Sequence, residues 1–254
     1  MPSVSVRALT RNPRSVNVRR QSARRRTVIT IDGPAGVGKS TTAKLLAKRL
    51  GLVYLDTGAT YRAVAHEVLE QGVDPRRPAA VARVARSIRL KLGHSAIGQL
   101  VVKVAGRDVT RAIRSERVTE AAAIIAQHPQ VRAAMVRLQR RLARGQSIVV
   151  EGRDTGSVVF PKASYKFFLT ADASVRARRR QKELLSLHGH APSFTMLAKQ
   201  LRRRDQLDRS REVGPLIRPA GSILVNTSSS GAAEVVEWML QHLASRPPAS
   251  TDGN

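Results

Sequence analysis

VITIDGPAGVGKSTT, residues Val28 to Thr42, is the stretch from which the fold is predicted. Val28–Ile31 is a run of β-favouring residues and predicts a short buried strand. Gly33–Ser40 then spells G-x-x-x-x-G-K-S, and leucines at helical spacing follow it. A strand, a glycine-rich turn and a helix N-terminus in this order are the context of a phosphate-binding P-loop. The stretch therefore predicts a nucleoside triphosphate site.

The residue types of this turn suit a triphosphate. Glycines permit the close approach of backbone N–H groups to phosphate oxygens, and the following helix adds N–H groups and the positive end of its dipole. We expect Lys39 to reach the β- and γ-phosphates and the Ser40 hydroxyl to hold Mg²⁺. A chance glycine turn between a strand and a helix is the alternative. The expected ATP-binding residues are Gly33, Pro34, Ala35, Gly36, Val37, Gly38, Lys39, Ser40 and Thr41.

The composition limits the classes of protein to consider. A length of 254 residues suffices for one well-buried α/β domain with a small insert. The absence of cysteine excludes disulfides, thiolate metal sites and cysteine nucleophiles. His188 and His190 flank Gly189 and are interpreted as a solvated loop in preference to a metal site. No apolar run approaches the roughly 18 residues of a membrane span, so no membrane association is expected.

The formal net charge of +27 is extreme for this length. Residues 1–26 contain eight arginines and no acid, yet the rest of the chain still carries a net charge of +19. This excess is either a nucleic-acid footprint or a means of binding polyanionic small molecules. Only 3% of the residues are aromatic, which leaves few for base stacking. We therefore favour small polyanions and expect no nucleic-acid partner.

Residues 1–26 are predicted to be a disordered basic extension. They lack the apolar segment of a secretory signal. Their arginine- and serine-rich composition without acids resembles an organellar transit peptide, and a basic tail or an upstream start that misplaces the true N-terminus is equally compatible. We favour a dispensable extension, with the fold starting at Thr27 and the protein acting in the cytoplasm.

Strand and helix patterns alternate along residues 27–254. This alternation predicts an α/β fold with a mostly parallel central sheet covered by helices, and ligands of such sheets bind at the carboxyl ends of the strands. Two apolar runs at 88–92 and 100–104 predict a hairpin in a small insert. Strands are expected at 28–31, 53–56, 148–150, 165–169 and 223–225, and helices after the P-loop and at 61–71, 79–87, 115–127, 131–144, 174–187, 194–211 and 232–243.

A P-loop alone does not distinguish a GTPase, a motor ATPase and a small-molecule kinase. The chain has no Asn-Lys-x-Asp segment for guanine and no evident hydrophobic strand ending in Asp-Glu. It does have arginine and carboxylate clusters at element boundaries downstream of the P-loop. An enzyme that transfers a phosphoryl group to an anionic acceptor needs such clusters, because two polyanions must be held together in line.

Five segments resemble motifs of the bacterial cytidylate kinases. They are ITIDGPAGVGKST, YLDTGATYR, HPQVR, EGRDTGSVVFP and RRRDQLDRSR, and the resemblance covers about Val28 to Leu243. It implies a P-loop kinase of the nucleoside monophosphate kinase type, which transfers the γ-phosphoryl group of ATP to CMP or dCMP with Mg²⁺. It also implies one domain at 27–254, with a β-containing NMP-binding insert at about 75–130 and an arginine-rich lid at about 173–212.

The resemblance implies roles for individual acceptor-binding residues. Thr57, where serine is more usual, keeps a hydroxyl near the cytosine, and Arg62 grips the acceptor phosphate. Arg132 and Asp154 read the base: a carboxylate accepts from the cytosine N4 amino group, and a guanidinium donates to N3 and O2. Uracil would leave both groups without matching partners. The implied CMP-binding residues are Thr57, Arg62, Arg132, Arg153, Asp154, Arg204, Asp208 and Arg211.

The implied catalytic residues are basic. Lys39, Arg153, Arg204 and Arg211 would neutralise charge on the transferred group. Arg204, Asp208 and Arg211 match positions of a lid that closes over ribose and phosphates. Helical arginines can also be solvated surface, and this is the favoured interpretation of Arg176–Arg180.

Other positions stay open or depart from the pattern. Asp56 either caps the following helix or touches substrate, and Tyr61 is expected to pack. Ala123 stands where the family usually has a serine that contacts the sugar. We therefore expect weaker discrimination between CMP and dCMP, or a substitute contact.

The sequence thus predicts a monomer with ATP and CMP or dCMP as substrates. The alternatives are another small-acceptor P-loop kinase, for UMP or shikimate, and a basic nucleic-acid-binding ATPase. Arg132 together with Asp154 favours cytosine.

Overall fold

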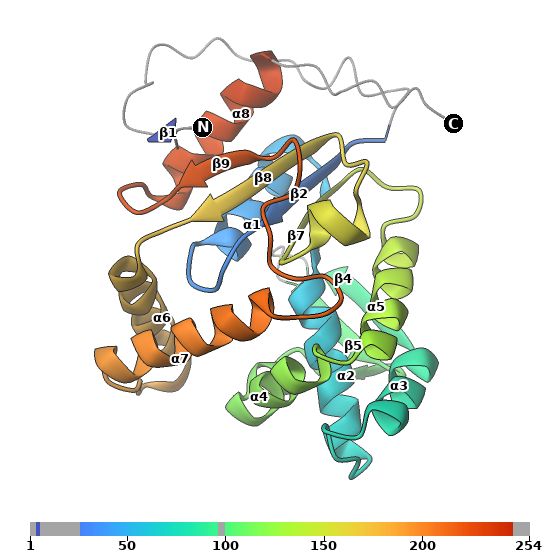
Figure 1. The fold of residues 1–254 in the computed structure, drawn as a ribbon. Helices are drawn as coiled ribbons and strands as arrows, with labels where there is room; N and C mark the ends of the chain where they lie inside the picture. Colours follow the sequence, from blue (N-terminus) through green and yellow to red (C-terminus); the bar gives the residue numbers. More distant parts are fainter. Residues whose placement is uncertain (1–3, 6–25, 96–99, 246–254) are drawn as a thin grey trace. The chain divides into compact units, whose positions relative to one another are not determined.

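The computed structural model describes residues 4–5, 26–95 and 100–245 (Figure 1). Its contacts divide the chain into two compact units. The first is built from the chain up to Leu55, Gly145–Arg211 and the chain from Pro215 onward, and the second from Asp56–Arg144 and Glu212–Gly214. The second unit thus includes the expected insert at 75–130 and extends beyond it at both ends.

A six-stranded sheet forms the centre of the first unit. Strand β2 pairs in parallel with both β7 and β8, and β9 pairs in parallel with β8 and β1. This arrangement confirms the predicted mostly parallel α/β sheet. In spatial order the strands are β1 (Val4–Ser5), β9 (Ile223–Asn226), β8 (Tyr165–Thr170), β2 (Val28–Asp32), β7 (Ile148–Gly152) and β3 (Val53–Asp56).

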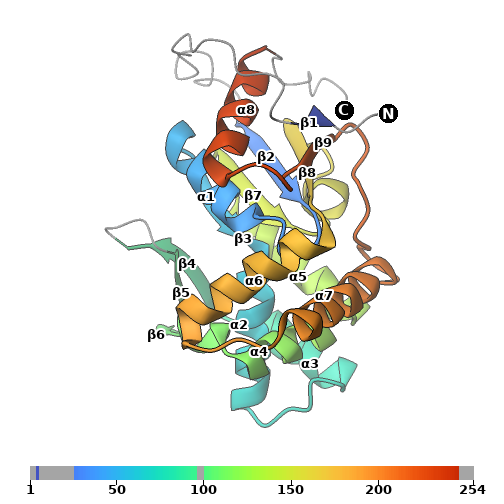
Figure 2. The ribbon, with the colours of Figure 1, turned by 90° about the vertical axis from the view of Figure 1, so that its left-hand side faces the viewer.

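Strands β2 and β7 are buried along nearly their whole length. Their sequences are runs of β-branched residues rather than alternating ones, as expected for parallel strands covered on both faces. Helix α1 packs against β7, and the short turn η4 packs against β2 and β7. Figures 1 and 2 show α1 and η4 on opposite faces of the sheet. The P-loop therefore follows a strand that is buried in all but its first residue, and it leads into a packed helix.

The helices of the first unit pack in pairs. Helix α8 packs on α1, and α6 packs on α7. On α8 the ring of Trp238 stacks on His242 at 5.6 Å and meets Phe167 of β8 edge-on at 6.4 Å. The elements are α1 (Lys39–Leu50), the π-helical turn η4 (Thr155–Val159), α6 (Ala173–His188), α7 (Phe194–Arg209) and α8 (Ala232–Ser245).

The second unit is mainly helical. Helix α2 packs against α4, and α3 packs against α5. A buried relay from Gln139 Nε2 to Thr60 Oγ1 (3.0 Å), and from Thr60 Oγ1 to the Thr57 carbonyl (2.7 Å), ties α5 to the start of α2. The elements are α2 (Thr57–Glu70), α3 (Pro78–Ser87), the antiparallel strands β4 (Leu90–His94), β5 (Leu100–Val104) and β6 (Arg107–Asp108), the 3₁₀ turn η3 (Ala112–Arg114), α4 (Glu116–Ile125) and α5 (Pro129–Leu142).

The predicted strands and helices are all present, with shifts at their ends. Helix α2 begins at Thr57 rather than at 61, because Asp56 accepts a hydrogen bond from the Ala59 amide and caps the helix. The short elements β6, η3 and η4 were not predicted. The expected disorder of residues 1–26 falls mostly on residues outside those described; within this extension, Val4–Ser5 forms β1 beside β9.

Gly33 fixes the sharp exit of the chain from β2. Its φ is +147°, and a Cβ at this position would lie 2.2 Å from the carbonyl oxygen of Leu169 in β8. We expect Gly33→Ala to lower the free energy of unfolding by about 3 kcal/mol, because the clash adds to backbone strain. Gly51→Ala is the control: its φ is +65° with no atom within 4 Å of the added Cβ, so only backbone strain of about 1–2 kcal/mol is expected. Urea unfolding of both variants measures the difference, and equal losses would contradict the steric argument.

Candidate functional site

The P-loop joins β2 to α1 and presents backbone donors. Helix α1 starts after Gly38, and among the described residues no side chain caps it and no acid lies in its first turn. Its first N–H groups and its dipole are therefore available to an anion. The Lys39 side chain is 6% exposed, and its Nζ donates to the Pro34 carbonyl at 2.6 Å. The lysine thus bridges the two ends of the loop.

The charge state of Lys39 is unusual. Burial, together with the nearby charges of Arg153 and Arg204, lowers the pKa of Lys39 to about 7, although the carboxylates of Glu151 and Asp208 oppose this shift. Removal from water and neighbouring cations both disfavour the charged ammonium. A bound triphosphate would favour the charged form of Lys39, because its negative charge offsets these effects. The site is therefore a cluster of positive charge that an anionic ligand stabilises.

The end of β2 is anchored by a residue that the sequence analysis missed. Asp32 is fully buried and accepts hydrogen bonds from Thr155 N (2.9 Å), Thr155 Oγ1 (2.8 Å) and Gly156 N (2.7 Å). Burial raises the pKa of Asp32, and the hydrogen bonds from Gly156 and Thr155 oppose that rise. Both carboxylate oxygens are engaged, so Asp32 holds η4 against the P-loop strand. An acid directly before the first loop glycine was the available signal.

Turn η4 follows the E-G-R-D segment at the carboxyl end of β7. Its backbone makes i-to-i+5 hydrogen bonds from Val159 N to Asp154 O (3.2 Å) and from Phe160 N to Thr155 O (2.7 Å). Such π-helical turns are frequent at functional sites. The Asp154 side chain is buried, and its charge acts on Asp32. Glu151, also buried, accepts a hydrogen bond from Tyr54 Oη at 2.5 Å.

The structure brings four predicted basic residues and one predicted acid into the same region of the first unit. Arg153 Nε donates to Asp208 Oδ2 at 2.8 Å, and Arg211 also pairs with Asp208. The charge of Arg204 acts on both Lys39 and Asp208. Hence Lys39 and Arg153, which are far in sequence from the 204–211 segment, are electrostatic neighbours of that segment.

Asp208 is the main counter-charge of this cluster. It is 3% exposed. Burial alone would raise the pKa of Asp208, but the guanidinium groups of Arg153, Arg211 and Arg204 overcome this and hold it below its ordinary value of 3.8. Burial of a carboxylate is tolerated here because two arginines bond to it directly.

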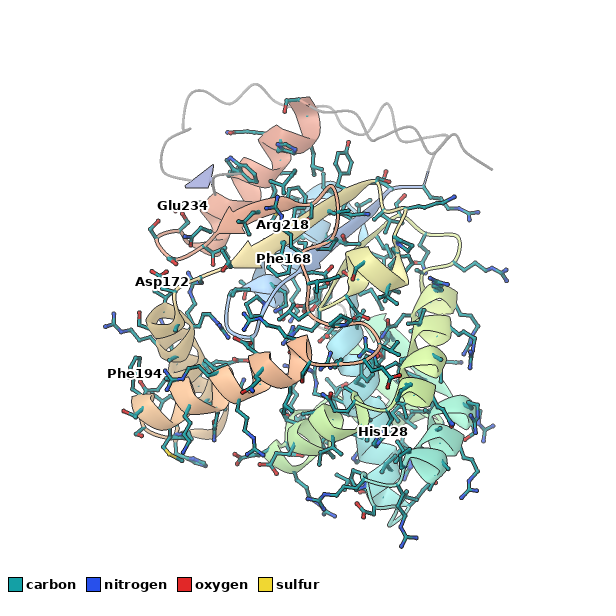
Figure 3. All side chains as sticks on the ribbon, viewed as in Figure 1. His128, Phe168, Asp172, Phe194, Arg218 and Glu234 are labelled. Carbon is teal, nitrogen blue, oxygen red and sulfur yellow. The ribbon has the colours of Figure 1, made fainter. Side chains whose placement is uncertain are left out.

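The predicted solvated surface at Arg176–Arg180 is wrong for two of its arginines. Both arginines lie on α6, whose start is marked by Asp172 in Figure 3; the label Phe194 marks the start of the neighbouring helix α7. Arg176 is 8% exposed and donates to the Ala35 carbonyl at 2.6 Å. Arg179 donates to the Val37 carbonyl at 3.4 Å and to the Thr227 carbonyl at 2.6 Å. Both side chains turn toward the P-loop because its carbonyls need donors.

The second unit positions the other predicted acceptor residues. Asp56 accepts from Ala59 N at 2.9 Å and from Arg62 Nη2 at 2.9 Å. It therefore caps α2 and also orients Arg62. Burial would raise the pKa of Asp56, but Arg62 and the Ala59 amide hold it below its ordinary value. Arg62 Nε is buried without a hydrogen-bond partner among the described residues, and Thr57 is buried at the first position of α2.

Arg132 is the largest of the fully buried side chains, at 1% exposure. Its Nη1 donates to the Ala126 carbonyl at 3.3 Å, and its guanidinium lies 5.7 Å from the centre of the Tyr61 ring. His128, labelled in Figure 3 at the start of α5, contacts the Pro75 carbonyl through Nε2 at 2.8 Å. Arg132 belongs to the second unit and Asp154 to the first.

Ala123 belongs to the second unit. It lies on α4 and is partly buried, and its carbonyl accepts from Gln127 Nε2 at 3.4 Å. The amide of Gln127 therefore lies one turn away from the methyl group. Its role at a sugar stays a prediction.

The donor set fits a hydrated magnesium ion that is held mainly by substrate phosphates. Ser40 is exposed at the start of α1. Across the described residues no group of three or more His, Asp or Glu side chains is suited to hold a metal by itself. Mg²⁺ bound with a nucleotide typically takes one or two protein ligands and completes its shell with phosphate oxygens and water. A single hydroxyl beside the P-loop is compatible with this.

The part of the chain that contains this site matches a known protein family. A family model described as cytidylate kinase matches residues 29–245. The chain belongs to the cytidylate kinase family. The match runs from the second residue of β2 to the last residue of α8 and includes both units.

Individual members of the family are similar to this chain over most of its length. The cytidylate kinase of Geobacillus kaustophilus is 44% identical over 218 residues, which cover 86% of this chain and 96% of that protein. The cytidylate kinase of Pelotomaculum thermopropionicum is 42% identical over 216 residues, 85% of this chain and 95% of that protein. In the bifunctional pantoate ligase/cytidylate kinase of a Synechococcus species, the match is 45% over 210 residues, 42% of that protein.

No helix in the described parts of the chain is both long and apolar enough to cross a membrane.

The buried Asp208 cluster predicts a pH-dependent loss of stability. Because the pKa of Asp208 is depressed in the folded state, its contribution is complete above pH 3.8 and is lost as the pH falls through the folded-state pKa. Asp208→Asn should lower the free energy of unfolding at neutral pH by about 3–5 kcal/mol, since it leaves two arginines facing a neutral group.

Urea unfolding at neutral pH and below about pH 4 tests this, and the difference between wild type and variant should shrink at low pH. Glu183→Gln is the control, because Glu183 is 53% exposed and pairs with Arg180; its effect should stay below about 1 kcal/mol. A difference that does not change with pH would contradict the assignment of the charge to Asp208.

Proposed function

We propose that this chain transfers the γ-phosphoryl group of ATP to CMP or dCMP and releases ADP with CDP or dCDP. Family membership over residues 29–245 supports this activity, and its named relatives are cytidylate kinases. The single structural observation that carries it is the convergence of Lys39, Arg153, Arg204 and Arg211 around Asp208 and Glu151, close to the P-loop.

The P-loop is proposed as the donor half of the site. Backbone N–H groups of Gly33–Gly38 and the start of α1 would hold the β- and γ-phosphates, with Lys39 as the charged ligand. Ser40 would hold Mg²⁺, which neutralises phosphate charge when it is bound. Thr41 follows Ser40 on the exposed part of the first turn.

The acceptor half is proposed to use Thr57, Arg62, Arg132 and Asp154. Arg62 is oriented by Asp56, so its guanidinium is ready for a phosphate. The acceptor phosphate is already a nucleophile near neutral pH, so no strong general base is needed. Lys39 and the arginines would balance charge on the transferred group, and closure over the substrates would exclude water.

The oligomeric state and the location stay predictions from the sequence: a monomer in the cytoplasm. A UMP or shikimate kinase and a nucleic-acid-stimulated ATPase are the competing functions, and neither has a specific observation in its favour.

A coupled assay of ADP release tests the proposed reaction. With CMP, dCMP, UMP and AMP as acceptors, we expect rapid turnover with CMP and dCMP and little with UMP and AMP. Lys39→Met should lower kcat at least about a hundredfold, because a positioned charge on the transferred phosphate is lost. ATP hydrolysis should not respond to added DNA or RNA. Turnover that is fastest with UMP, or stimulation by nucleic acid, would contradict the proposal.

Asp154→Asn tests the reading of the base. An asparagine offers an N–H₂ group to the position-4 substituent, which suits the uracil carbonyl and not the cytosine amino group. We expect kcat/KM for CMP to fall about ten- to hundredfold, with a smaller fall or a gain for UMP. The KM for ATP serves as the internal control and should hardly change. Equal losses for CMP and UMP would show that Asp154 does not select the base.

A further inference from the structure

Two arginines of α6 donate hydrogen bonds to backbone carbonyls of the P-loop. Arg176 Nε donates to the Ala35 carbonyl at 2.6 Å. Arg179 Nη1 donates to the Val37 carbonyl at 3.4 Å and to Thr227 Oγ1 at 3.0 Å, and Thr227 Oγ1 itself donates to the Val37 carbonyl at 2.9 Å. With Lys39 on the Pro34 carbonyl, three carbonyls of the loop have side-chain donors.

The orientation of these carbonyls determines where the loop's N–H groups point. A peptide unit is planar and trans, so its C=O and the following N–H point in opposite directions. Side-chain donors on the carbonyls of Ala35 and Val37 therefore turn the N–H groups of Gly36 and Gly38 the other way. An anion that lies on that side meets N–H groups, and neither of these two carbonyls repels it.

Packing holds the same contact in place. Ala35, Ala177 of α6 and Leu201 of α7 form one buried apolar cluster. A Cβ on Gly36 would lie 3.0 Å from the Arg176 carbonyl oxygen and 3.2 Å from the Arg176 Cβ. The loop thus lies directly on the first turn of α6, with no room for a larger residue at position 36.

A buried ion pair links this contact to α7. Arg176 Nη1 lies 2.7 Å from Asp205 Oδ2, and the two side chains are 9% and 5% exposed. Arg176 Nη2 and Asp205 Oδ1 are also buried, and neither has a hydrogen-bond partner in the described part of the chain. A buried ion pair with two such atoms is a poor source of stability compared with apolar packing. It does fix the guanidinium that holds Ala35.

We propose that Arg176 and Arg179 are positioning residues of the phosphate-binding loop, and that the Arg176–Asp205 pair makes the loop geometry depend on α7. Helix α7 also carries Arg204 and Asp208, which belong to the basic cluster around Lys39. The inference rests on the proposed function and adds to it the residues that prepare the loop for its ligand.

The experiment measures the binding of tripolyphosphate and of ATP to the full chain by isothermal titration calorimetry. Tripolyphosphate has no base or sugar, so it reports on the loop alone. Arg179→Met and Arg179→Lys should both weaken its binding about tenfold or more, because a lysine keeps the charge but does not bridge the carbonyls of Val37 and Thr227. Asp205→Asn, which keeps the size of the side chain, should weaken binding about three- to tenfold through Arg176.

Arg180→Met is the matched control. Arg180 is the neighbour of Arg179 on α6 and bonds to the exposed Glu183 at 2.8 Å. It should bind tripolyphosphate like the wild type. Steady-state kinetics of each variant should show the KM for ATP raised and the KM for CMP at saturating ATP nearly unchanged, a split that general loss of structure would not produce. Circular dichroism confirms that each variant is folded at the assay temperature.

The outcomes separate the inference from the function on which it rests. Wild-type binding by Arg179→Lys would mean that charge alone matters and would overturn the positioning role. Unchanged binding in Asp205→Asn would overturn the link to α7. Wild-type chain that binds neither ATP nor tripolyphosphate would contradict the proposed function itself. Weakened binding in Arg179→Lys and in Asp205→Asn, with Arg180→Met unchanged, supports the inference.

Discussion

Buried positive charge in the first unit requires buried carboxylates, and the rest of that unit is arranged around this requirement. An isolated ion in a protein interior is strongly unfavourable unless an opposite charge and hydrogen bonds compensate for it. Asp205 and Asp208 lie three residues apart on α7 and serve arginines from different segments. One holds Arg176 of α6, and the other holds Arg153 at the end of β7. A single turn of helix therefore ties together three parts of the chain.

The second unit uses the same chemistry at the start of a helix. Asp56 follows directly on β3, caps α2 and bonds to Arg62 one and a half turns later. Of the two interpretations that the sequence left open for Asp56, the structure shows the helix cap, and contact with substrate stays a prediction. A carboxylate that caps a helix also places a guanidinium beside the helix N-terminus, where the dipole and the arginine both favour an anion.

Local patterns were sufficient for the elements and for the P-loop, but not for the partners of the loop. Hydrophobic periodicity identified α6 and showed that Arg176–Arg180 is polar. It contains no information on whether a polar face meets solvent or the carbonyls of a loop about 140 residues earlier. Asp32 was missed for the same reason, since its partner Thr155 is 123 residues away. The motif resemblance predicted which residues belong to the charge cluster. The pairing of Arg153 with Asp208 could be seen only in the folded structure.

Intrinsic tryptophan fluorescence reports on only one of the two units. Trp238 is the single tryptophan of the sequence, and it stacks on His242 and meets Phe167 within the first unit. Its emission therefore reports on the packing of α8 against β8, and a protonated imidazole beside the indole would quench it. The second unit contains no tryptophan, so unfolding of its helices does not change the tryptophan emission directly. Two units with one reporter can unfold at different denaturant concentrations while fluorescence records a single transition.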